Sequence, residues 1–195
     1  RRDKVKSNML FDMSDLSAEN SSRVFAHFEW QMSDKLIANT GFMPESKDGG
    51  LRVGSYRMAF NYQLANNHTL RLAFNHGHRA PTLLESNQST FVRYDENLIL
   101  DGVVVSDSDI HAEKLISSEL GYAGSLFNDH LHLDMRLFSE KMSDVIAERR
   151  EQNPDFEGQL NNRDNTDSVT ARGLEWQAQY RPSSQFLIHA NYSFV

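Results

Sequence analysis

Two pairs of histidines have a spacing that could chelate a metal ion. His76 and His78 are separated by one glycine, and His130 and His132 by one leucine. Residues two apart on a β-strand point to the same face, so each pair could supply two ligands. Neither pair has a third ligand at a fixed spacing, and a turn or rim position explains each histidine equally well. We therefore expect no metal site.

Clustered carboxylates could bind calcium, which prefers oxygen ligands. One polar segment carries Asp107, Asp109 and Glu113, and another carries Asp164 and Asp167. Neither segment has the glycine-containing twelve-residue pattern of a dedicated calcium loop. Solvated acidic loops are the interpretation that these residues favour.

Motifs for catalysis are missing from the sequence. It contains no Gly-x-Ser-x-Gly elbow, no glycine-rich phosphate loop and no His-Glu-x-x-His pattern. The absence of cysteine excludes thiolate nucleophiles, thiolate metal sites and disulfides. The sequence therefore predicts that the chain is not an enzyme and needs no cofactor.

Composition narrows the class of protein further. The 195 residues carry a formal net charge of −7, which argues against a nucleic-acid partner. No apolar run approaches the roughly 20 residues of a membrane-spanning helix. Arg1–Lys6 leads into mixed polar sequence, so no signal peptide is expected. A membrane β-barrel has average composition as well, and these figures leave that class open.

Apolar and polar residues alternate along most of the chain, which is typical of strands with one apolar face. In Tyr56–Leu64, for example, every second residue is aromatic, Met or Leu. The pattern predicts roughly eight strands and little helix. They are Val24–Met32, Lys35–Met43, Tyr56–Leu64, Leu70–Phe74, Leu115–Gly124, Leu131–Leu137, Leu174–Tyr180 and Phe186–Phe194.

The connections between these strands alternate between short and long. The short ones are rich in turn-forming residues: Ser33–Asp34, Ala65–Asn67, Phe127–Asp129 and Arg181–Ser184. The long ones are polar: Pro44–Arg52, Pro81–Lys114 and Ala147–Ser168. This alternation predicts an antiparallel up-and-down meander with tight turns at one rim and long loops at the other.

A soluble β-sandwich and a transmembrane β-barrel both fit the alternation. Five of the eight predicted strands run nine or ten residues, which is long for a soluble protein and sufficient for a tilted crossing of a bilayer. Aromatic residues also gather near the tight-turn rim, as at membrane interfaces. These residues are Trp30, Tyr62, Tyr122, Tyr180 and Phe186. Both features favour the barrel.

Several segments follow one another in a distinctive order and spacing. In Phe74–Glu85 a strand breaks at Arg-Ala-Pro before a short apolar stretch and an acid. The others are Ser118–Tyr122, Leu131–Phe138, Asp144–Ile146, Gly173–Glu175, Tyr180–Pro182 and Asn191–Tyr192. In order and spacing these segments resemble those of TonB-dependent outer-membrane receptors, and the resemblance covers most of Arg23–Val195.

The resemblance implies an all-β fold that forms part of a barrel of about 22 strands in the outer membrane of a Gram-negative bacterium. Roughly eight strands are too few for that barrel, so residues 1–195 are interpreted as a fragment that lacks the plug domain. Residues 1–22 are interpreted as the end of a preceding strand and its loop. The isolated fragment could form an open sheet, a rearranged small barrel or edge-to-edge dimers.

The resemblance also implies active uptake of a scarce ligand, such as a ferric siderophore, haem, cobalamin or a glycan. An inner-membrane protein would supply energy through the plug domain, and outer-membrane lipid would surround the barrel. Loops Glu85–Lys114 and Ala147–Ser168 would capture the ligand, with Arg79, Glu85, Arg93 and Tyr94 as rim candidates. For Arg79 a structural role is favoured, since Pro81 must end or bend its strand.

Two alternatives stay open. The chain could be a self-contained soluble or membrane β-barrel or sandwich that acts as a binding or adhesion module. It could also be a barrel hydrolase that uses serine and histidine on its outer wall. Ser118 is the nearest nucleophile candidate, but an ordinary small wall residue is the favoured interpretation.

Overall fold

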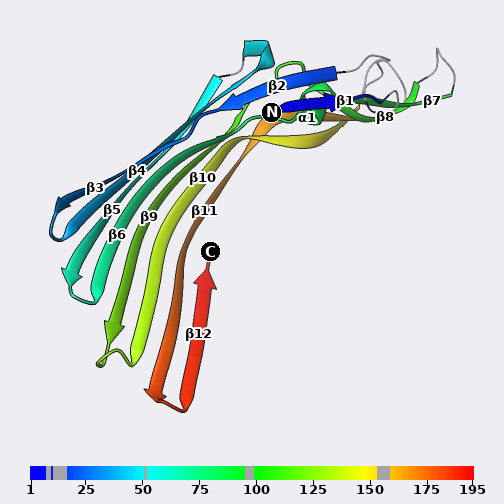
Figure 1. The fold of residues 1–195 in the computed structure, drawn as a ribbon. Helices are drawn as coiled ribbons and strands as arrows, with labels where there is room; N and C mark the ends of the chain where they lie inside the picture. Colours follow the sequence, from blue (N-terminus) through cyan, green and yellow to red (C-terminus); the bar gives the residue numbers. More distant parts are fainter. Residues whose placement is uncertain (8–9, 11–16, 51, 95–98, 153–158) are drawn as a thin grey trace.

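A computed structural model describes residues 1–7, 10, 17–50, 52–94, 99–152 and 159–195 (Figure 1). Strands dominate the described part of the chain and join into one long, bent sheet. The strands are β1 Arg2–Val5, β2 Ser17–Arg23, β3 Ala26–Ser33, β4 Leu36–Lys47, β5 Arg52–Ala65, β6 His68–Arg79, β7 Ser89–Arg93, β8 Ile99–Ser106, β9 Glu113–Leu126, β10 Leu131–Gln152, β11 Gln159–Ser183 and β12 Phe186–Phe194. A short helix, α1, spans Leu83–Asn87, and a 3-10 turn spans Asp48–Gly50. No helix in these ranges is long and apolar enough to cross a membrane.

An antiparallel meander forms the centre of the sheet, in the order β4-β5-β6-β9-β10-β11. β2 and β3 both pair with β4, while β12 and β8 both pair with β11. The four tight turns, β3–β4, β5–β6, β9–β10 and β11–β12, lie at the same end of the sheet (Figure 1). All eight predicted strands are present, and the predicted all-β meander is confirmed.

The prediction of long loops is largely wrong, because most of these residues belong to strands that extend the sheet. β4 and β5 continue until only four residues separate Lys47 from Arg52. β10 and β11 also run on, and Pro81–Lys114 contains α1, β7 and β8. Backbone pairing does not require an apolar face, so strands with polar residues on both faces lose the period-two signal. Residues 95–98 and 153–158 of these loops lie outside the described residues.

The sheet has two parts, which meet at a bend (Figure 1). We call the first part the wall. It consists of β3–β6, β9, β12, β10 as far as Asp144, and the portion of β11 that pairs with that part of β10. The second is the arm: β1, β2, α1, β7, β8, and β10 and β11 beyond Asp144. At the bend the β10–β11 register shifts, and Asp144 has a φ of 57°. Asn165 holds this bulge by donating from Nδ2 to the carbonyl oxygens of Asp144 (2.6 Å) and His111 (3.0 Å).

The two faces of the wall differ in polarity. One row of paired residues crosses six strands on the apolar face: Tyr62, Leu70, Tyr122, Met135, Trp176 and Tyr192. Many large apolar side chains on this face are exposed, including Phe28 at 68% and Trp30 at 65%. In the part of the chain that the structure describes, no large side chain is fully buried and no second layer covers the apolar face. The structure is therefore a single sheet and not a sandwich.

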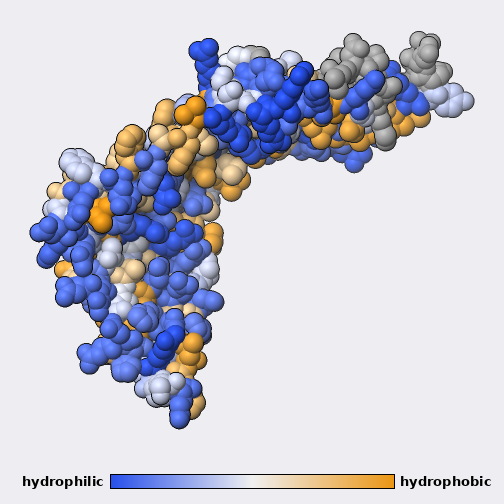
Figure 2. All heavy atoms as spheres, viewed as in Figure 1, coloured by the Kyte–Doolittle hydropathy of each residue, from blue (hydrophilic) through white to orange (hydrophobic). Residues whose placement is uncertain are grey.

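Charged side chains link four strands across the polar face. Glu119 accepts from Arg71 Nε (2.9 Å) and from Arg136 Nη1 (3.4 Å), and Arg136 Nε donates to Glu175 (2.8 Å). These bonds connect β6, β9, β10 and β11 in sequence. Figure 2 shows hydrophilic residues over most of the visible surface of the wall. A polar face of this kind suits water, and the apolar face suits lipid.

Candidate ligand-binding site

The segment after β6 forms a corner at the junction of wall and arm. β6 ends at Arg79, as the following Pro81 predicts, because proline cannot donate to the strand ladder. Thr82 then caps α1: its Oγ1 accepts from Glu85 N (3.2 Å), and Glu85 Oε2 accepts from Thr82 N (2.7 Å). This reciprocal capping box explains why a five-residue helix forms directly after the proline.

Arg79 joins three elements at this corner. Its Nη1 and Nη2 donate to the two oxygens of Glu85 at 2.9 and 3.0 Å, and its Nε donates to Glu113. The other oxygen of Glu113 accepts from Ile146 N on β10 (2.9 Å). Glu113 is buried at 7% exposure, and Ala80 beside Arg79 is also buried. We call Arg79, Glu85 and Glu113 the corner cluster; it ties α1, β9 and β10 to the end of β6.

Electrostatics explain why both carboxylates stay ionised in the corner cluster. The hydrogen bond from Arg79 lowers the pKa of Glu113 below its usual 4.5. Partial burial alone would raise the pKa of Glu85, but hydrogen bonds from Arg79 and Thr82 outweigh burial and lower it. The same ion pairs raise the pKa of Arg79. The geometry supports a structural role for Arg79, and contact of Arg79 or Glu85 with a ligand stays a prediction.

Acid is expected to loosen the corner cluster. Because the folded pKa of Glu85 and of Glu113 is lowered from 4.5, their stabilisation is complete above that pH. It is lost as the pH falls through the folded values. The thermal midpoint of the full-length protein should therefore drop below pH 4.5, and the double variant E85Q/E113Q should show a smaller drop. Equal pH profiles for the two proteins would contradict this assignment.

The other two predicted site residues lie elsewhere. Arg93 ends β7, with its guanidinium 5.4 Å from the centre of the Phe91 ring. Tyr94 follows it and is 77% exposed. β7 begins two residues after the end of α1 and runs towards the far end of the arm (Figure 1). The structure thus brings Arg79 and Glu85 together but separates them from Arg93 and Tyr94, whose contact with a ligand stays a prediction.

Local contacts surround both histidine pairs, although His76 Nδ1 is buried without a hydrogen bond from any described residue. The His76 ring contacts His78 at 4.5 Å between ring centres. His130 lies in the β9–β10 turn with its Nδ1 2.8 Å from the Arg181 carbonyl oxygen, and His132 Nδ1 lies 2.7 Å from Ser125 Oγ. In the described ranges, no three His, Asp or Glu side chains are grouped so that they could hold a metal ion.

The acidic residues of the two polar segments, which could have bound calcium together, each have separate local partners. Asp107 Oδ1 accepts from Asp109 N at 2.9 Å, which is a local turn. Asp164 accepts from Thr166 (2.8 Å), and Asp167 pairs with Arg149 at 3.2 Å. Glu113 belongs to the corner cluster. The geometry therefore favours local and structural roles for these carboxylates.

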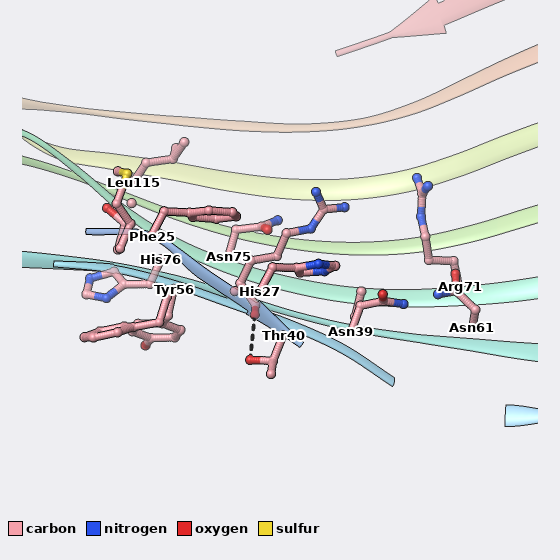
Figure 3. Close-up of a pocket in the computed structure, with 17 residues that line it drawn as sticks. Phe25, His27, Asn39, Thr40, Tyr56, Asn61, Arg71, Asn75, His76 and Leu115 are labelled. Carbon is pink, nitrogen blue, oxygen red and sulfur yellow. Dashed lines mark hydrogen bonds between the residues drawn. The ribbon is translucent and has the colours of Figure 1, made fainter. Parts of the chain in front are cut away.

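A groove of about 680 Å³ lies on the polar face of β3–β6 (Figure 3). Its polar lining includes Arg57 and Asn75, which pair in register on β5 and β6. In Figure 3, Asn75 and Arg71 point to one side of the strands, while Thr40 and Tyr56 point to the other. Sequence reasoning missed this groove. Its only signal was the polar parity of separate strands, and the register that unites them was not known.

Comparison with known proteins assigns the family. Residues 5–195 match the model of the TonB dependent receptor-like beta-barrel. No curated protein matches the sequence. Among solved structures, the siderophore receptor PirA from Pseudomonas aeruginosa has a TM-score of 0.82 at 13% identity, covering 99% of this chain and 37% of that one.

Two other solved structures share the fold. The ferric enterobactin receptor PfeA from Pseudomonas aeruginosa, as a Q482A mutant in complex with enterobactin, has a TM-score of 0.75 at 15% identity, covering 94% of this chain and 28% of that one. The copper transporter OprC has a TM-score of 0.67 at 15% identity, covering 93% and 30%. This chain thus spans about a third of the length of these proteins. It belongs to the TonB-dependent receptor family, and its sheet is part of that family's β-barrel.

Proposed function

We propose that this chain is part of an outer-membrane receptor that takes up a scarce ligand by energy-coupled transport. Family membership carries the proposal, because members of this family are transport receptors of the Gram-negative outer membrane. Candidate ligands are a ferric siderophore, haem, cobalamin or a glycan. The siderophore receptors among the similar structures favour the first of these.

The two faces of the wall support this placement. The exposed apolar face would contact outer-membrane lipid, with the row from Tyr62 to Tyr192 at one interface. The polar face would line the path of the ligand. The arm would lie outside the cell and capture the ligand through β7, β8 and the β10–β11 hairpin. Arg79, Glu85, Arg93 and Tyr94 remain our rim candidates for ligand contact.

We also propose that the complete receptor contains further barrel strands and a plug domain. Residues 1–195 would be one portion of the barrel domain. Residues 1–22, which contain β1 and most of β2, would contribute the end of a preceding strand and its loop. β3 and β12 each have one partner strand in the described sheet, so further strands would continue it at both edges. A plug domain elsewhere in the protein would receive energy from an inner-membrane coupling protein.

Cysteine labelling of the full-length protein tests the topology. This chain has no cysteine, so single variants Y94C in the arm and D34C in the β3–β4 turn are specific reporters; any cysteine elsewhere is replaced by serine. Both positions are exposed. A membrane-impermeant maleimide should label Y94C on intact cells, and D34C only after the outer membrane is permeabilised. Labelling of D34C on intact cells would refute the topology.

The self-contained binding module is not favoured by the geometry. A soluble sandwich requires a second layer over its apolar face, and the described part of the chain forms one sheet. Ser118 pairs in register with Phe74 on the apolar face, where a wall residue is expected.

A further inference from the structure

We propose that the groove on the polar face of β3–β6 is a binding subsite for an oxyanion attached to an apolar or aromatic body. Arg57 would be its anion contact. The proposal rests on the proposed function, since it places the subsite on the face that would line the ligand's path. The subsite lies on the wall and is distinct from the rim, where the arm would make the first contact with the ligand.

The shape of the groove comes from small residues between larger ones. Gly41 pairs with His27 on β3 and with Arg57 on β5, and it leaves a gap between their side chains. A Cβ at Gly41 would approach the Phe25 ring at 3.9 Å and His27 at 4.0 Å, which are ordinary contacts. Ala59 continues the floor at 3% exposure. These small residues therefore form the floor of the groove, and the larger polar side chains form the rim of the groove.

Charge favours an anion in this groove. Among the described residues that line it, none is an aspartate or a glutamate. Arg71 at one end is neutralised by Glu119, whereas the Arg57 guanidinium has no hydrogen bond or ion pair with any described residue. The Thr40 hydroxyl donates to the Arg57 carbonyl oxygen (3.1 Å), which links β4 to the backbone of the anion contact (Figure 3). An exposed guanidinium at this position presents its forked donors to a carboxylate or a similar oxyanion.

Three asparagines add neutral donors around Arg57. Asn39, Asn61 and Asn75 line the groove from β4, β5 and β6, and none has a side-chain partner within the described ranges. None of these amides is among the fully buried polar groups, so they remain accessible to water or a ligand. Amide donors beside an arginine can complete the hydrogen bonds of a bound oxyanion.

The other end of the groove is apolar. Phe25, Met43 and Leu115 line it, next to the polar residues. A ligand with only charged groups would leave this surface unused. An aromatic or aliphatic body next to the oxyanion would cover it, because burial of apolar area is favourable. The groove thus fits an aryl carboxylate, or a chemically similar oxyanion, better than a bare inorganic anion.

Salicylate is a suitable probe, and salicylamide is its neutral counterpart. Calorimetry with the purified full-length protein should show binding of salicylate and weaker binding of salicylamide. The variant R57Q should weaken salicylate binding about tenfold or more, because a hydrogen bond to a charged group is lost. R172Q removes the same charge from the opposite face, in line with Ser139, Ser118 and Phe74, and should bind like the parent protein.

Three outcomes would overturn the proposal. One is equal binding of salicylate by R57Q and the parent protein, and another is no binding by the parent protein. The third is a lower thermal midpoint for R57Q than for the parent protein without salicylate, which would assign the groove to an acidic side chain from elsewhere in the receptor. None of these results affects the topology test with Y94C and D34C, so the subsite and the proposed function can fail separately.

Discussion

Replacing Arg79 with alanine is expected to destabilise the full-length protein by about 2 kcal/mol. The change removes the forked bond to Glu85 and leaves the buried Glu113 with the Ile146 N–H as its only described partner. A charge that is buried without its partner typically costs about 3–5 kcal/mol. The Arg79 side chain is 48% exposed, so water compensates part of that cost. Denaturant titration in detergent measures the difference.

Two further variants test whether the lost ion pair is the cause. R79A/E113Q should recover part of the stability, because neutral glutamine no longer requires a cation. R149A removes an arginine from an exposed pair with Asp167, in which both side chains are about half exposed. It should cost less than about 1 kcal/mol. If R79A costs no more than R149A, the corner cluster is not a significant source of stability.

Alanine at Gly173 is expected to have an effect of similar size. A Cβ there would collide with the backbone carbonyl oxygen of Phe194 on β12 and approach the Phe138 ring to 2.7 Å. The backbone on one side and a buried ring on the other leave little room to adjust. Overpacking of this kind costs about 1–3 kcal/mol, and β12 should be displaced from β11.

Gly77 provides the matched control, since it also lies within a wall strand. A Cβ at Gly77 would meet only the Leu115 Cβ, at 3.9 Å, which is an ordinary contact. G77A should therefore be neutral, or slightly stabilising because the unfolded chain loses freedom. Unfolding of both variants in detergent gives the comparison. Equal stability of G173A and G77A would show that β12 does not pack against Gly173 in this register.

The wall could be predicted from the sequence because its two faces meet different surroundings. Alternation in Tyr56–Leu64 and Leu131–Leu137 gave correct strands, and turn residues such as Asn66 located the hairpins. Pro81 correctly ended β6. The arm was harder to predict because its strands carry polar residues on both faces. The β10–β11 extension and the parallel β8–β11 pair therefore left no periodic signal.

The candidate sites show a similar division. Arg79 and Glu85 were recognised together because the strand break and the helix cap are local features. Their partner Glu113 was assigned to an acidic loop, since the β6–β9 register that brings it to Arg79 is a long-range property. The groove around Arg57 depends on register in the same way.

The sequence by itself determined the residue types: histidine pairs two apart, carboxylates in polar segments, and an Arg-Ala-Pro break. It also determined which residues share a strand face, because side-chain direction alternates with every residue. Only the tertiary structure decided which of these groups meet. Pairing across strands joined Glu113 to Arg79 and left Arg57 without a partner among the described residues, beside three accessible asparagines. Cross-strand neighbours are distant in sequence, and the register that aligns them is a property of the whole sheet.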